Sequence, residues 1–93
     1  MELRHIRYFL AVAREGNFTR AAAKIGIGQP PLSQQVRDLE TEIGTPLFHR
    51  VPHGAELTEA GSAFLDIVAQ FPDLAERAIR AAQRAGRGEV GSI

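Results

Sequence analysis

Three polar side chains, Ser33, Gln34 and Arg37, fall on one face of a short predicted helix, with Gln29 and Pro30 at its leading end. Serine, glutamine and arginine side chains can all hydrogen-bond base edges in the major groove of DNA, and arginine pairs with guanine through two donors. The opposite face carries apolar residues spaced by four, three and four positions, namely Leu32, Val36, Leu39 and Ile43. This spacing predicts a helix that buries one side and exposes the other for contact with base pairs.

A helix-turn-helix over residues 18–37 is predicted to hold this exposed face. The first helix shows three- and four-residue apolar spacing at Phe18, Ala21, Ala22 and Ile25. Asn17 is a favourable N-cap, and Gly26 stands where a left-handed residue ends a helix. Pro30 and Pro31 are tolerated in the first turn of the second helix. The alternative is an ordinary helical hairpin with a solvated polar face.

Charge is distributed in a way that supports a nucleic-acid contact. Eleven basic and eleven acidic residues give a formal net charge of zero. No acid occurs between Gly16 and Arg37, whereas Asp38, Glu40 and Glu42 crowd the far end of the second helix. Affinity for DNA should therefore depend on individually placed contacts and on doubled sites rather than on bulk charge.

Backbone phosphates are the expected partners of a second group of residues. Arg4 lies near the start of a predicted helix over residues 2–15. Thr19 and Arg20 lie in the first turn of the next helix, where free N–H groups favour a phosphate. Residues 47–51 and 55–58 are predicted to form a two-stranded wing around a turn at 52–54. Arg50 and His53 lie on this wing, within reach of the DNA backbone or the minor groove.

A long helix over residues 59–87, capped by Thr58, is predicted to mediate dimerisation. At about 1.5 Å per residue it would be roughly 40 Å long, more than a small core can cover. The expected interface residues are Phe64, Ile67, Val68, Phe71, Leu74, Ala75 and Ala78. Pro72 should bend the helix. The alternative is that the helix folds back on its own domain.

Composition excludes several other classes of protein. There is no cysteine, so disulfides and thiolate metal sites are ruled out, and the spacing of His49 and His53 on a strand and turn does not predict a metal site. No catalytic group is expected, since no nucleophile accompanies these histidines. No signal peptide or membrane span is predicted, so a cytoplasmic, nucleoid-associated protein is expected. Residues 88–93 read as a hinge towards a further domain.

The segments MELRHIRYFLAVAREGNFTRAAAKIGIGQPPLSQQVRDLETEIGTPLFHR and LTEAG resemble the N-terminal DNA-binding domain of LysR-type transcriptional regulators. The opening MELRHIRYF is most similar to activators of aromatic-compound catabolism. The resemblance implies a mainly α winged helix-turn-helix over residues 1–58, followed by a linker helix that forms a homodimer. It also implies an absent effector-binding domain that responds to a small-molecule co-inducer, no cofactor in this domain, and tetramers of the full-length protein on partly palindromic double-stranded promoter DNA.

The resemblance also assigns contacts residue by residue. It implies base contacts from Gln29, Pro30, Ser33 and Gln34, a minor-groove contact from His53, and backbone contacts from Arg4 and Arg50. Three positions depart from the family's usual residues: Gly28 where serine is frequent, and Gln34 and His53 where arginine is common. Glutamine suits adenine better than guanine.

Sequence-specific DNA binding in bacterial transcription regulation is the function predicted from these observations. A protein-binding adaptor, with the polar helix face against an acidic partner, is the rival hypothesis. An enzyme would need a polar cleft with paired acid and base groups, which the sequence does not supply.

Overall fold

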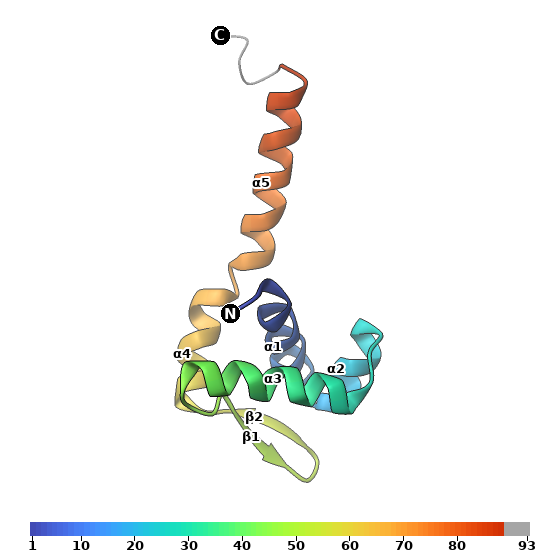
Figure 1. Cartoon of the computed structure of the whole chain (residues 1–93), viewed down its shortest axis with the longest axis vertical. Helices are drawn as coiled ribbons and strands as arrows, with labels where there is room; N and C mark the ends of the chain where they lie inside the picture. Colours follow the sequence, from blue (N-terminus) through green and yellow to red (C-terminus); the bar gives the residue numbers. More distant parts are fainter. Residues whose placement is uncertain (89–93) are drawn as a thin grey trace.

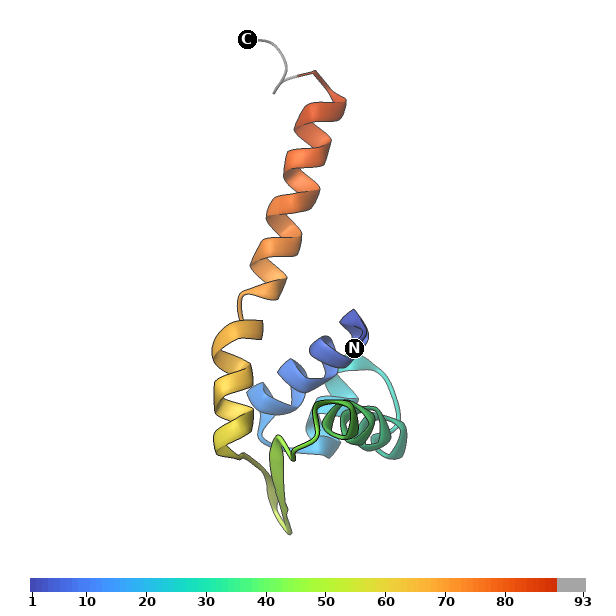
Figure 2. The ribbon, with the colours of Figure 1, turned by 60° about the vertical axis from the view of Figure 1, so that its left-hand side comes forward.

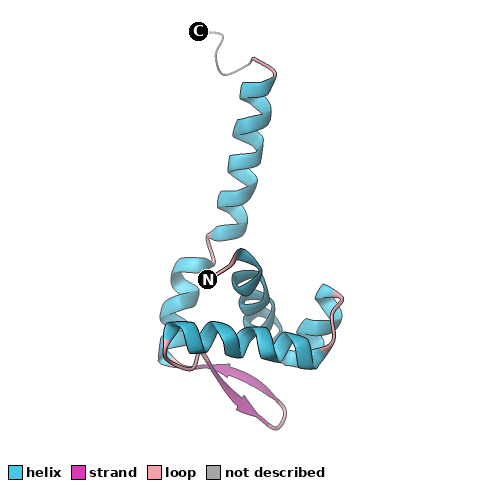
Figure 3. Cartoon of the chain, in the orientation of Figure 1, coloured by secondary structure: helices cyan, strands magenta, loops and turns pink. Residues whose placement is uncertain are grey.

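The computed structural model describes residues 1–88 as a helical domain with a two-stranded wing and a projecting C-terminal helix (Figure 1). The predicted hinge at residues 88–93 lies outside the described residues from 89 onwards. Three helices, a two-stranded hairpin and then further helix follow one another in the order that the sequence predicted (Figure 3), which confirms a mainly α winged helix-turn-helix fold. The elements are α1 (Leu3–Glu15), α2 (Phe18–Ile25), α3 (Gln29–Ile43), β1 (Phe48–Val51), β2 (Gly54–Leu57), α4 (Glu59–Val68) and α5 (Phe71–Gly86).

Caps fix the ends of α2 and the start of α4 where the sequence predicted them. The Asn17 side chain accepts a hydrogen bond from the backbone N–H of Arg20 at 2.8 Å, which starts α2. Gly26 ends it with a φ of 78°, a conformation that costs glycine little. Thr58 Oγ1 accepts from the N–H of Gly61 at 2.9 Å and so starts α4. Each of these caps involves residues close in the chain, so the ends of the helices follow from local sequence.

A single core lies between α1, α2, α3, α4 and the base of the wing (Figure 2). Phe9 is at its centre and is fully buried. Its ring lies 5.2 Å from that of Phe48 on β1 and 4.9 Å, edge-on, from that of Phe64 on α4. The other large residues with less than 2% exposure are Val12, Leu32, Val36, Leu39 and Leu47. The core thus joins α3, the wing and α4 into one unit.

The wing is an antiparallel pair in which Phe48 is opposite Leu57 and Val51 is opposite Gly54. It is held to the helices by its backbone. The N–H of Ala55 donates to the carbonyl of Gly16 at 2.9 Å, in the turn between α1 and α2. A Cβ at Gly54 would lie 2.6 Å from that same Gly16 oxygen, so this close approach requires glycine.

The predicted helix over residues 59–87 is in fact two helices. α4 ends at Val68 and α5 starts at Phe71, with Ala69 and Gln70 between them. Pro72 lies in the first turn of α5, where it takes away no intrahelical hydrogen bond, instead of bending a continuous helix. The break lets α4 pack on its own domain while α5 projects away from it.

This break corrects two of the predicted interface residues. Val68 is 3% exposed and belongs to the domain's own core, so its assignment to a dimer interface was wrong. Phe64 is partly buried against Phe9 and also packs within the chain. The alternative of a helix that folds back on its own domain therefore describes α4 but not α5.

Candidate nucleic-acid interface

α3 presents the predicted reading face with one exception. Pro30, Gln34 and Arg37 are exposed, and Gln29 is partly exposed at the first residue of the helix. Ser33 is only 6% exposed, so its placement on the outer face was wrong. Leu32 and Ser33 are both buried, and the backbone carbonyl of Ser33 accepts a hydrogen bond from Arg50 Nη2 of the wing. A base contact by Ser33 would have to be made from the floor of the hollow between α3 and the wing.

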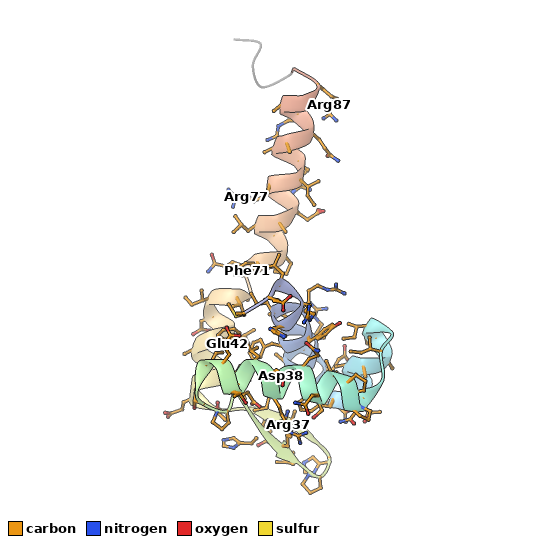
Figure 4. The ribbon with its side chains drawn as sticks, in the orientation of Figure 1. Arg37, Asp38, Glu42, Phe71, Arg77 and Arg87 are labelled. Carbon is orange, nitrogen blue, oxygen red and sulfur yellow. The ribbon has the colours of Figure 1, made fainter. Side chains whose placement is uncertain are left out.

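That hollow lies where α2, α3 and the wing meet. Figure 4 shows Arg37 on the side of α3 that faces the wing. The lining includes two arginines and, among the described residues, no acid. It consists of Asn17, Phe18, Thr19, Gln29, Ser33, Arg37, Arg50, Val51, Pro52 and Gly54. Two guanidinium groups beside the free N–H groups at the start of α2 favour an anionic ligand, such as a phosphate.

Arg50 is held from three sides. Its guanidinium carbon lies 4.6 Å from the centroid of the Phe18 ring, within the range of a cation–π interaction. Nη2 donates to the carbonyl of Ser33 at 3.5 Å, and Nη1 donates to Glu40 Oε1 at 3.3 Å. The side chain is 28% exposed. Arg50 therefore connects α2, α3 and β1, a structural role that the sequence prediction of a DNA contact did not include.

Glu40 completes the connection between α3 and the wing. Its Oε2 accepts hydrogen bonds from the backbone N–H groups of Leu47, at 2.7 Å, and Phe48, at 3.2 Å. With Oε1 on Arg50, one carboxylate joins three donors from the start of the wing, and it is 11% exposed. From the sequence, Glu40 was predicted only to be an acid far from the contact end of α3. Its seven-residue separation from Leu47 gave no local signal for this contact.

The remaining predicted backbone contacts lie in different places. Thr19 lines the hollow and is exposed. Arg20 is exposed and donates to the carbonyl of Glu15 at 3.0 Å. Arg4 lies on α1, where its Nε donates to Gln35 Oε1 of α3 at 3.2 Å, so it is outside the hollow. His53 is exposed in the wing turn. The structure thus brings Thr19 and Arg50 together and places Arg4 elsewhere on the surface.

Gln34 has a partner that the sequence analysis missed. Its Nε2 donates a hydrogen bond to Asp38 Oδ1 at 2.9 Å. Residues four apart on a helix are neighbours, so the spacing alone could have indicated this contact. Asp38 also marks the point at which the acid-free stretch ends.

α5 exposes an apolar stripe along its length. Leu74 is 52% exposed and Ile79 is 55% exposed, and Ala75 and Ala78 lie between them. Among the residues that the structure describes, none of those in α5 is buried. Phe71, at its first position, is half-buried against the core. Of the predicted interface residues, Ile67, Leu74, Ala75 and Ala78 therefore remain available to a partner.

Other kinds of site find no support in the described part of the chain. Within residues 1–88, histidine, aspartate and glutamate nowhere gather in a group of three that could hold a metal ion. None of the helices described is long and apolar enough to cross a membrane.

The three-helix core, the exposed polar face of α3 and the wing beside it define a winged helix-turn-helix protein. A family model described as "Bacterial regulatory helix-turn-helix protein, lysR family" matches residues 3–62. The chain belongs to this family, as the sequence resemblance predicted.

Named relatives span the whole chain. It is 54% identical over 93 residues to the HTH-type transcriptional regulator BudR of Klebsiella aerogenes and 47% identical to TfdT of Cupriavidus pinatubonensis. These alignments cover all of this chain but 65% of BudR and 41% of TfdT. The chain thus spans less than two thirds of these curated relatives, all of which are transcriptional regulators by name.

Solved structures match the fold closely. The crystal structure of a CbnR_DBD–DNA complex superposes with a TM-score of 0.87 at 40% identity and covers 92% of this chain and 99% of that one. The BenM_DBD/catB site 1 DNA complex gives a TM-score of 0.88 at 38% identity, with coverages of 92% and 96%. Full-length CbnR complexed with its target DNA gives 0.87 at 41% identity, over 95% of this chain and 31% of that one.

Proposed function

We propose that this chain is the sequence-specific DNA-binding part of a LysR-family bacterial transcription regulator. One observation carries the proposal: α3 exposes Gln34 and Arg37 beside the arginine-lined hollow formed with α2 and the wing. Residues suited to contact bases and residues suited to bind phosphates therefore lie on the same side of the molecule. This arrangement is required when a helix enters the major groove of DNA. Membership of the family and the likeness to domains solved with DNA support the same assignment.

Within this proposal the contacts divide by chemistry. Gln29, Pro30, Gln34 and Arg37 approach base edges in the major groove, and Ser33 reaches the same groove from the floor of the hollow. His53 extends from the wing to the neighbouring minor groove. Thr19, Arg20 and Arg50 bind phosphates around the hollow, and Arg4 binds a further phosphate from α1, where it lies beside Gln35 of α3.

A second copy completes the site. The exposed stripe on α5 is the proposed dimer interface, because a second α5 would remove Leu74, Ala78 and Ile79 from water. Two α3 helices held at a fixed distance would then contact two half-sites of a partly palindromic promoter. Tetramers, a small-molecule co-inducer bound by a separate effector domain, and a cytoplasmic, nucleoid-associated location complete the proposal for the whole regulator. Neither a cofactor nor an enzymatic activity is assigned to this domain.

Selection from a random duplex library followed by a mobility-shift assay tests this function. We expect recovery of a sequence with two related half-sites that an unlabelled scrambled duplex does not displace. Equal displacement by scrambled and selected duplexes would contradict sequence-specific binding. If no duplex is bound while an acidic protein is captured through the α3 face, the chain is instead the adaptor considered above.

A further inference from the structure

Gln34 and Asp38 occupy successive turns of the exposed face of α3. The Gln34 side-chain nitrogen, Nε2, donates to Asp38 Oδ1 at 2.9 Å, and both residues are exposed. Asp38 forms no ion pair among the residues that the structure describes. Figure 4 shows Asp38 on α3, the same helix as Arg37, whose label lies nearer the wing. The hydrogen bond to Gln34 is therefore the principal contact of this carboxylate.

We propose that Asp38 is a positioning residue that determines base specificity by fixing the orientation of the Gln34 carboxamide. The proposal rests on the DNA-binding function above, in which Gln34 meets a base edge. With Nε2 turned to Asp38, the oxygen Oε1 is the atom that Gln34 offers to the base. A base that presents a donor is then preferred over one that presents only acceptors.

The preference follows from the donors and acceptors of both groups. An ionised carboxylate only accepts hydrogen bonds, so a flipped carboxamide would place Oε1 against Oδ1 with no hydrogen between them. One hydrogen of Nε2 is engaged by Asp38, and the second is free. Oε1 and this second hydrogen match the N6 donor and the N7 acceptor of adenine. Guanine offers N7 and O6, two acceptors, so its O6 would meet Oε1.

The carboxylate of Asp38 cannot serve to attract the DNA phosphates, because it carries the same sign of charge as they do. A negative charge on a DNA-facing helix weakens binding to every duplex by a similar factor, because each duplex carries the same backbone charge. A ratio of affinities for two duplexes that differ at one base pair cancels this common factor. That ratio therefore isolates the orienting effect of Asp38 from its charge.

The test measures the affinities of wild type, Gln34→Ala, Asp38→Ala and Asp38→Asn for the selected duplex and for its single-base-pair variants. Gln34→Ala first identifies the base pair that Gln34 reads. We expect wild type to prefer adenine there over guanine by about 5- to 150-fold, the range for one bidentate pair. Asp38→Ala should remove most of this preference and leave those at other base pairs unchanged.

Asp38→Asn separates orientation from side-chain size. Asparagine has nearly the same shape, but its amide can donate to Oε1 as well as accept from Nε2, so both orientations of Gln34 become possible. We expect it to relax the adenine preference almost as far as Asp38→Ala. Glu42→Gln, which removes an acid from the far end of α3, is the matched control for charge and should keep the preference.

The outcomes distinguish this inference from the proposed function. If Asp38→Ala and Asp38→Asn keep the preference that Gln34→Ala removes, the orienting role is overturned while DNA reading by Gln34 stands. If Gln34→Ala changes no base preference, the proposed contact by Gln34 itself is wrong, and the role of Asp38 is overturned with it. Failure of the wild type to distinguish any duplex would contradict the proposed function.

Discussion

Glu40 on α3 accepts a hydrogen bond from Arg50 Nη1 on β1 at 3.3 Å, and the same carboxylate also accepts from two backbone N–H groups at the start of the wing. These hydrogen bonds fix the position of the wing relative to α3. The two elements are expected to contact neighbouring grooves of one duplex, so their relative position matters for binding. Arg50 thereby combines a structural contact with its proposed phosphate contact.

Replacing Glu40 with alanine should destabilise the fold. The N–H groups of Leu47 and Phe48 would lose their acceptor at residues that are only 1% and 4% exposed. A buried donor left without a partner costs about 1–3 kcal/mol, so we expect the free energy of unfolding to fall by about 2–4 kcal/mol. Urea denaturation followed by circular dichroism measures this loss.

Glu56→Ala is the matched control, since Glu56 is an exposed glutamate on β2 of the same wing. It should change the free energy of unfolding by less than about 0.5 kcal/mol. Equal losses for both variants would show that the Glu40 contacts do not stabilise the wing.

Arg50→Ala should weaken binding to selected and scrambled duplexes by a similar factor. A phosphate contact carries no sequence information, and its loss should reduce the slope of log Kd against log salt concentration by about one. Fluorescence anisotropy at several salt concentrations gives both quantities. Arg14→Ala, which removes an exposed arginine from α1, should leave them unchanged. A loss confined to the selected duplex would instead make Arg50 a base reader.

Leu74→Glu should convert the dimer to a monomer without unfolding the domain. Leu74 is 52% exposed in the single chain, so a charge at this position should destabilise the dimer, where it would be buried, and not the folded monomer. Analytical ultracentrifugation measures the change. Phe71→Glu is less informative, because Phe71 also packs against the domain's own core. Gln83→Glu, a polar position of α5, is the control, and an undiminished dimer of Leu74→Glu would contradict this interface.

Gly61→Ala should destabilise the junction between the wing and α4. A Cβ at Gly61 would lie 2.0 Å from the carbonyl oxygen of Leu47, so backbone would have to move. Overpacking of this kind costs about 1–3 kcal/mol, which thermal denaturation would record as a lower Tm. The neighbouring exposed residue gives the control, Ser62→Ala, with a Tm close to that of the wild type. Equal Tm values for the two variants would refute the close packing.

Features governed by local chemistry were predictable from the sequence. Asn17, Gly26 and Thr58 act as caps at the predicted positions because capping depends on residues close in the chain. The alternation in residues 47–51 likewise predicted a wing strand. The apolar spacing of α3 correctly placed Leu32 and Val36 in the core.

Features that depend on distant contacts were not predictable. Ser33 is buried where α3 meets α2 and the wing, and Val68 is buried because α4 packs against the core. Ile43 continues the apolar spacing of α3 but is 40% exposed, because it is the last residue of the helix. The hydrogen bonds of the Glu40 carboxylate depend in the same way on where the wing begins. The helical spacing of residues in the sequence does not indicate that position.

Methylation protection on the selected duplex tests most directly whether α3 enters the major groove. Dimethyl sulfate modifies guanine at N7 in the major groove and adenine at N3 in the minor groove, so one reagent reports on both. The account predicts protection of major-groove N7 atoms in two segments separated by one helical turn or a multiple of it. Protection confined to minor-groove N3 atoms, or no protection on a duplex that the protein binds, would contradict it.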